Sequence, residues 1–180
     1  MDNDQRASLE DLVLAPYIQK ATALIGYSRR VGGNQFRHAM ATLAILIDYR
    51  CTDPVLLKAS VIHDLFEEVP ATDRGSIRAI DDDGPAVAAL VDEVSRRPGE
   101  AKATFLARLR DEGSERARLL KVADRISNLT DLHETIFKRA FVDDYVDQTR
   151  EYVLPMALAV KPQMAVEIAD LMQRRSQARG

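Results

Sequence analysis

Apolar residues recur at intervals of three and four along nearly the whole chain. This spacing places them on one face of an α-helix, whereas a half-buried β-strand would show strict alternation. There is no clear alternating segment, and no Asn-Gly or Asp-Gly pair stands between β-branched runs, where it would indicate a hairpin. The pattern therefore predicts an all-α fold.

Prolines, glycines and capping residues divide the chain into its expected helices. Ser8 begins the first, which extends to about residue 24 with a kink at Pro16. Asp53 and Pro54 supply an N-cap and a first-turn proline for a helix that continues through Val69. The other expected helices span residues 36–49, 73–83, 86–97, 101–110, 114–136, 142–160 with a kink at Pro155, and 162–175. Residues 26–34, which contain three glycines, are expected to form a loop. We expect a single domain over residues 1–180 with roughly eight to ten helices.

Composition narrows the classes of function. With 180 residues, 46% of them hydrophobic, the chain is long enough for one domain with a substantial core. Its net charge of −3, with acids and bases interspersed, argues against a nucleic-acid partner. No apolar run reaches the roughly 18 residues that would suggest a membrane span. A single cysteine, Cys51, cannot form an internal disulfide, which fits the reducing cytoplasm. Nothing in the sequence indicates the oligomeric state.

Polar residues that interrupt the apolar helices indicate a metal site. His63 and Asp64 are neighbours within the apolar stretch from Ala59 to Phe66. Uncompensated charge in a low dielectric is strongly disfavoured, and a divalent cation would remove that problem. His38 upstream and Asp124 downstream can complete a set of two imidazoles and two carboxylates.

Two more acids follow on the same predicted helix. Glu67 comes four residues after His63, and Glu68 comes four after Asp64, so a continuous helix would present all of them to one region. A His-Asp pair alone is common by chance, and a Glu-Glu pair on a helix is usually just solvated. The combination is what favours a metal. His133, in a polar stretch, is expected to be an exposed helix residue rather than a ligand.

Together these residues resemble the HD superfamily of metal-dependent phosphohydrolases, whose pattern is His, then His-Asp, then Asp. The resemblance is closest to the hydrolase domain of RelA/SpoT homologues and to the small alarmone hydrolases. The matching segments are Arg29-Arg30-Val31-Gly32 ahead of His38, His63-Asp64-Leu65-Phe66-Glu67-Glu68, and Ala123-Asp124-Arg125-Ile126-Ser127-Asn128. The resemblance covers roughly residues 10 to 160 and implies an HD-type helical fold.

The resemblance also implies roles for individual residues. The metal ligands would be His38, His63, Asp64 and Asp124. Glu67 and Glu68 would orient or deprotonate the attacking water, with Glu67 as the first candidate for the base. Arg29 would stack on a nucleobase, and Lys121 and Asn128 would lie near the ribose and phosphates. Mixed nitrogen and oxygen ligation suits Mn²⁺ better than Mg²⁺.

The implied activity is removal of the 3′-diphosphate from a (p)ppGpp-like or ppApp-like alarmone of the stringent response, with release of pyrophosphate. The binding partner would be this small nucleotide, and neither a nucleic acid nor a membrane is expected as a partner. A bifunctional enzyme is not expected either, because the length leaves no room for a synthetase domain. Glu68 stands where the family usually has Asp, and Gly33-Asn34-Gln35-Phe36 replaces its Glu-Pro-Tyr, so the choice between guanine and adenine stays open.

Three alternatives remain open from the sequence. The protein could be an HD-type phosphatase that acts on another nucleotide, because such an enzyme would share the metal ligands. It could also be a non-enzymatic module that senses a nucleotide. Arg125 either offsets substrate charge or forms a structural ion pair.

Overall fold

The computed structural model describes residues 2–132 and 137–177, and the secondary structure in these ranges is helical. They contain no strand, only an isolated bridge between Ser28 and Asn34. The all-α prediction is therefore confirmed. Backbone packing divides the chain into two compact units. The N-terminal unit comprises Met1–Ser28 and Gly33–Ser95, and the C-terminal unit comprises Arg29–Gly32 and Arg96–Gly180.

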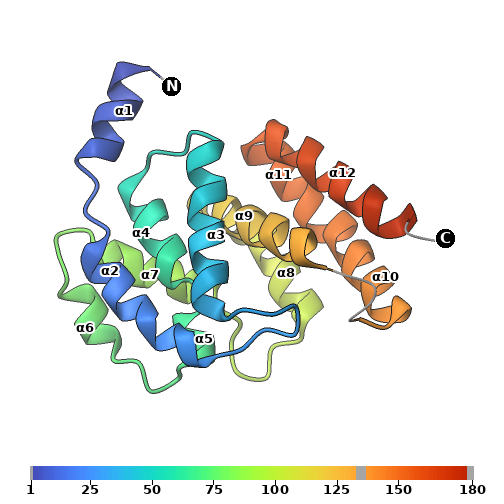
Figure 1. Ribbon diagram of the computed structural model, residues 1–180, viewed down its shortest axis with the longest axis horizontal. Helices are drawn as coiled ribbons and strands as arrows, with labels where there is room; N and C mark the ends of the chain where they lie inside the picture. Colours follow the sequence, from blue (N-terminus) through green and yellow to red (C-terminus); the bar gives the residue numbers. More distant parts are fainter. Residues whose placement is uncertain (1, 133–136, 178–180) are drawn as a thin grey trace. The chain divides into compact units, whose positions relative to one another are not determined.

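The N-terminal unit is built around one buried helix, α4, which packs against α2, α3 and α7 (Figure 1). Every residue of α4 from Val55 to Ile62 is buried, as expected for a helix whose residues are apolar apart from Lys58 and Ser60. The elements of this unit are α1 (Asn3–Glu10), α2 (Ala15–Ala21), the 3₁₀ helix η1 (Thr22–Gly26), α3 (Gln35–Asp48), α4 (Pro54–Ile62), α5 (Leu65–Glu68), α6 (Arg74–Arg78) and α7 (Gly84–Val94).

The start of α4 is as predicted, but its end is not. The Asp53 side chain accepts a hydrogen bond from the N–H of Leu56, and Pro54 occupies the first turn. The helix ends at Ile62, whereas the sequence pattern predicted its continuation through Val69. The Nδ1 atom of His63 lies 2.8 Å from the Ser60 carbonyl, the acceptor that a continuing helix would offer to the next N–H. The second motif therefore lies on a turn followed by the short helix α5.

The single helix expected from Ser8 to about residue 24 was also a wrong prediction. The chain forms α1, then a non-helical stretch, then α2 and η1. Pro16 lies in the first turn of α2, where its missing N–H removes no helical hydrogen bond. Pro16 therefore favours the start of α2, whereas the sequence pattern predicted that it would kink a longer helix.

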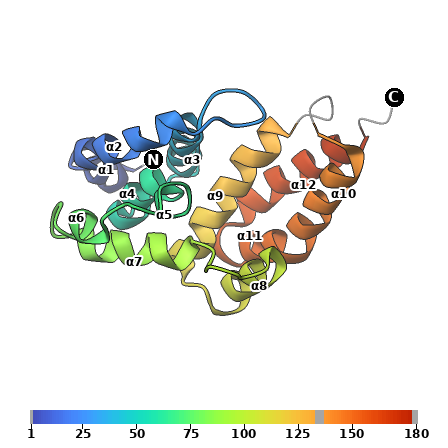
Figure 2. The same cartoon turned by 90° about the horizontal axis from the view of Figure 1, so that it is seen from below.

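The C-terminal unit is built around α9, which packs against α11 and α12 (Figure 2). Its N-cap is Ser114, where the sequence predicted the helix to start, and the Ser114 side chain accepts from the N–H of Ala117. The predicted helix end and His133 lie in residues 133–136, outside the described residues. The elements are α8 (Lys102–Glu112), α9 (Glu115–Asp131), α10 (Arg139–Gln148), the π-helix η2 (Thr149–Val153), α11 (Leu154–Val160) and α12 (Pro162–Gln177).

The helix expected over residues 142–160, with a kink at Pro155, instead contains the π-helix η2 directly before α11. Pro155 lies in the first turn of α11, directly after η2. Because proline has no N–H, Pro155 cannot donate the α-helical hydrogen bond to the Glu151 carbonyl, and an Arg110 guanidinium nitrogen lies 3.5 Å from this oxygen. Within the described residues, no helix combines the length and apolar character that crossing a bilayer requires.

Candidate functional site

Two of the predicted ligands, His38 and His63, lie side by side in the N-terminal unit. Asn34 caps α3 by accepting from the N–H of Arg37, and this start places His38 on the buried face of the helix. His63 follows the last residue of α4. Both imidazoles are at least 95% buried, and their ring centroids lie 5.2 Å apart in an edge-on arrangement.

The carboxylate of Asp64 faces both rings. Its Oδ2 lies 3.7 Å from Nε2 of His38, and its Oδ1 lies 3.3 Å from Nε2 of His63. Three groups that can bind a metal therefore converge within the N-terminal unit. Imidazole nitrogen and carboxylate oxygen are the donors that a divalent transition metal accepts together.

The hydrogen bond of His63 to the backbone fixes which ring nitrogen can act as a ligand. The Ser60 carbonyl can only accept, so Nδ1 of His63 must carry the proton. In the neutral ring, Nε2 then keeps its lone pair and faces Asp64. Metal-bound histidines usually show this pattern, with the second ring nitrogen donating to a carbonyl or carboxylate.

The two acids of α5 have different surroundings. Glu67 is exposed, whereas Glu68 is partly buried and accepts a hydrogen bond from the side-chain amide of Gln35 over 2.9 Å. Gln35 is the first residue of α3 and was not among the predicted site residues. No local pattern could have identified it, since the two partners are 33 positions apart.

The remaining predicted site residues are gathered in the C-terminal unit. Asp124 is buried on α9, with Nζ of Lys121 2.7 Å from its Oδ2. Nδ2 of Asn128 donates to its Oδ1 over 2.5 Å. Spacings of three and four residues place these side chains on one face of the helix. Burial alone would lower the pKa of Lys121, but the Asp124 carboxylate outweighs it and raises this pKa above its ordinary value.

Arg29, in the glycine-containing loop, contacts the same face of α9. Its Nη1 donates to Asp131 over 2.7 Å, and its Nη2 donates to Oδ1 of Asn128 over 2.8 Å. The side chain is 10% exposed. The two hydrogen bonds fix the plane of the guanidinium, because its donors lie in that plane.

Arg125 has neutral hydrogen-bond partners in the structure. It is 1% exposed, and its Nη1 donates to the hydroxyl of Thr149 and to the carbonyl of Tyr145. The guanidinium also lies 4.1 Å from the centroid of the Tyr145 ring. Arg125 therefore joins α9 to α10 and the π turn, a structural role that involves no carboxylate among these contacts.

Lys102 is a cation that the sequence did not single out. Its Nζ lies 4.7 Å from the centroid of the Tyr145 ring. Burial of the ammonium, with smaller contributions from nearby Arg125 and Lys121, lowers the pKa of Lys102 to about 8, although part of the side chain stays exposed. Lys102 and Arg125 thus both lie against the ring of Tyr145, and Lys121 is close enough to act on the pKa of Lys102, which makes a suitable environment for an anion.

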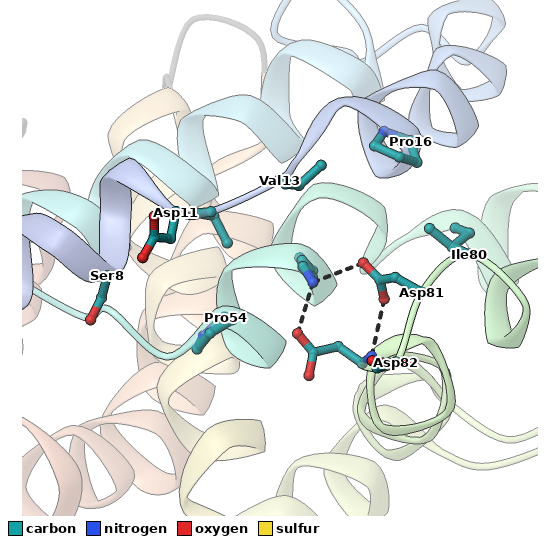
Figure 3. A pocket seen from close by; sticks show the side chains of 11 residues that line it. Ser8, Asp11, Val13, Pro16, Pro54, Ile80, Asp81 and Asp82 are labelled. Atoms are coloured by element: carbon teal, nitrogen blue, oxygen red, sulfur yellow. Dashed lines mark hydrogen bonds and ion pairs between the residues drawn. The ribbon is translucent and has the colours of Figure 1, made fainter.

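A cavity of about 560 Å³ in the N-terminal unit is separate from these residues (Figure 3). It lies between the segment around Asp11 and Val13 and the acidic turn that contains Asp81. Lys58, in its wall, already binds the carboxylates of Asp81 and Asp83 over 2.8 and 2.7 Å. None of the predicted site residues lines this cavity, so it does not contribute to the candidate site.

Comparison with known proteins identifies the fold. No protein-family model and no curated protein sequence matches the chain. A solved structure of a metazoan ortholog of SpoT, described as hydrolyzing ppGpp and playing a role in starvation responses, matches with a TM-score of 0.77. The identity is 22%, and the match covers 90% of this chain and 94% of the other. This likeness confirms the expected all-α fold, which the chain shares with that protein.

Proposed function

We propose that this protein, which shares its fold with a SpoT ortholog, is a metal-dependent phosphohydrolase that acts on an alarmone. The reaction would remove the 3′-diphosphate from a (p)ppGpp-like or ppApp-like nucleotide and release pyrophosphate. The observation that supports it most is the convergence of His38, His63 and Asp64, with Nε2 of His63 bearing the lone pair. We propose a cytoplasmic location, which suits the single cysteine.

The proposed ion is Mn²⁺, held by His38, His63, Asp64 and Asp124. The first three converge within the N-terminal unit, and Asp124 is a buried carboxylate with both oxygens in polar contacts. A bound divalent cation lowers the pKa of water and offsets negative charge on a phosphoryl group. The donor set of nitrogen and oxygen favours Mn²⁺ over Mg²⁺.

The chain's own acids would handle the proton of the attacking water. In hydrolysis, a water oxygen bonds to phosphorus and a carboxylate accepts the water proton. The bond to the 3′ oxygen breaks, and this oxygen takes up a proton and leaves as a hydroxyl group. Glu67 and Glu68 are the candidates for this base. Glu67 is exposed to solvent, whereas Gln35 fixes the orientation of Glu68. We propose that Glu67 accepts the proton and that Glu68 orients the water.

The cations of the C-terminal unit would bind the rest of the nucleotide. Lys121 and Lys102 would offset phosphate charge, and their ammonium groups lie over the rings of Phe105 and Tyr145 respectively. Asn128 would lie near the ribose. Arg29 uses its in-plane donors on Asn128 and Asp131, so its flat faces are the surfaces that a nucleobase could stack on.

Product analysis tests the proposal. The purified protein is incubated separately with ppGpp and ppApp, with Mn²⁺ and with a chelator, and pyrophosphate is measured. We expect Mn²⁺-dependent pyrophosphate release that is lost in Asp64→Asn and Asp124→Asn. Asp82→Asn is the matched control, because Asp82 is an exposed acid in the wall of the separate cavity.

Other results would support a different function or a different set of metal ligands. Release of orthophosphate alone would favour a phosphatase of the same fold that acts on another nucleotide. Tight nucleotide binding with neither bound metal nor turnover would instead indicate a sensor. Mn²⁺ binding that is unchanged in Asp124→Asn would remove Asp124 from the ligand set.

A further inference from the structure

A continuous series of hydrogen bonds connects the loop residue Arg29 to Asp124. Arg29 donates to Oδ1 of Asn128 over 2.8 Å, and Nδ2 of Asn128 donates to Oδ1 of Asp124 over 2.5 Å. Asp131 binds the second nitrogen of the same guanidinium over 2.7 Å. All four residues belong to the C-terminal unit. We infer that Arg29 is a positioning residue that acts through Asn128 on the orientation of Asp124, an inference that rests on the proposed metal site.

The direction of this series follows from the chemistry of its members. A guanidinium has five N–H donors and no acceptor, so Asn128 can only turn its carbonyl oxygen toward Arg29. The amide nitrogen must then point the other way, toward Asp124. With Arg29 removed, the carbonyl oxygen of Asn128 loses the donor that holds it, and only the contacts of the amide nitrogen with Asp124 remain. The plane of the amide, and with it the direction of its hydrogen bond to the Asp124 carboxylate, is then less well fixed.

Asp124 is held on both of its oxygens. Asn128 donates to Oδ1, and Lys121 lies 2.7 Å from Oδ2. The lysine is a point charge on a flexible stem, so it attracts the carboxylate without fixing its plane. The planar amide of Asn128 supplies the directional contact, and Arg29 holds the carbonyl end of that amide. Outer contacts of this kind orient a metal ligand before the ion arrives.

This role differs from contact with a nucleobase in a way that can be measured. A residue that only stacks on the base affects nucleotide binding and has no effect on metal affinity in the absence of nucleotide. A residue that positions Asp124 affects metal affinity with no nucleotide present. The two interpretations therefore separate in a titration with Mn²⁺ alone.

The experiment is calorimetric titration of the metal-free full chain with Mn²⁺, without nucleotide. We expect Arg29→Ala and Asn128→Ala each to weaken Mn²⁺ binding about tenfold, the lower end of what removing an outer contact does. The double variant should bind Mn²⁺ no more weakly than Asn128→Ala, because Arg29 acts through Asn128. Arg30→Ala is the matched control, since Arg30 is the exposed neighbour in the same loop. Its Mn²⁺ affinity should equal that of the wild type.

Thermal unfolding of each metal-free variant checks that the fold is intact. If Arg29→Ala does not fold, Arg29→Lys carries the test, because a lysine cannot bind Asn128 and Asp131 with one planar group. Wild-type Mn²⁺ affinity in the Arg29 variant, or strictly additive losses in the double variant, would overturn the inference and leave the proposed function standing. Absence of Mn²⁺ binding by the wild type would overturn both.

Discussion

The side-chain amide of Gln35 donates to a carboxylate oxygen of Glu68 over 2.9 Å. Gln35 is the first residue of α3 and Glu68 is the last residue of α5, so the contact fixes an acid at the end of a short helix. We expect Gln35→Ala to lower kcat about tenfold with little change in KM, because loss of orientation at a reacting group reduces rate. Steady-state kinetics of pyrophosphate release measures both parameters.

Two further variants serve as comparisons for Gln35→Ala. Glu68→Gln should lower kcat by about 100-fold or more, as expected for a group that takes part in proton transfer or directs it. Gln19→Ala, which changes an exposed glutamine on α2, should leave both parameters unchanged. An increase in KM alone for Gln35→Ala would mean that Gln35 contacts substrate and does not orient Glu68.

The contact between His63 and Ser60 predicts a specific tautomer. Because Nδ1 lies 2.8 Å from a carbonyl, it must carry the proton in the neutral ring. We expect two-bond ¹⁵N–¹H spectra of the metal-free protein at neutral pH to show His63 as the Nδ1–H form. Addition of Mn²⁺ should broaden the His63 and His38 ring signals selectively. A predominant Nε2–H form of His63 would contradict its assignment as a ligand through Nε2.

Lys102 predicts how activity responds to alkaline pH. Burial first, and then the neighbouring cations Arg125 and Lys121, lower the pKa of Lys102 to about 8. The lysine is charged below this pH and neutral above it, so an anionic substrate loses a partner as pH rises. We expect kcat/KM to fall as pH rises through about 8, and the fall to shift to higher pH in Lys102→Arg.

Lys102→Ala should raise KM about tenfold at pH 7, the effect of losing one hydrogen bond to a charged group. Lys138→Ala serves as its control, because Lys138 is exposed ahead of α10. An alkaline profile that is identical in the wild type and Lys102→Arg would show that Lys102 does not bind substrate phosphate.

Most helix starts were predictable because the residues that set them are local. Asp53 with Pro54, and Ser114, form the expected caps, since a cap needs only a side-chain oxygen three residues before an N–H. The end of α4 was not predictable in the same way. The apolar pattern continues beyond Ile62, but the helix ends where Nδ1 of the His63 ring forms a hydrogen bond with the Ser60 carbonyl.

The residues of the candidate site could be predicted from the sequence, but the side-chain contacts between them could not. His63 and Asp64 could be recognised because they interrupt an apolar stretch. The contact of Arg29 with Asn128 joins positions 99 residues apart, a relationship that helical periodicity does not encode. Lys102 resembles any solvated helix residue in the sequence, and only its position beside Tyr145 makes it a candidate.

The acidic partners of Lys58 predict how the stability of the N-terminal unit depends on pH. Burial alone would raise the pKa of Asp81, but hydrogen bonds from Lys58 and Tyr17 outweigh it and lower this pKa below its ordinary 3.8. The ionised form is therefore favoured by folding. Its contribution to stability is present above about pH 4 and is lost as pH falls below that value. Asp81→Asn should remove this part of the acid sensitivity.

Removal of the lysine should destabilise the fold at neutral pH. Lys58 is 7% exposed and binds both Asp81 and Asp83, so Lys58→Met leaves two carboxylates without their cation. Because both carboxylates stay partly exposed, we expect a loss of about 2 kcal/mol in the free energy of unfolding by urea, below the roughly 3 to 5 kcal/mol of a fully buried pair that loses one member. Lys161→Met, at a partly exposed lysine of the C-terminal unit, should change stability by less than about 0.5 kcal/mol. Equal stability of the two variants would mean that water, and not Lys58, compensates these carboxylates.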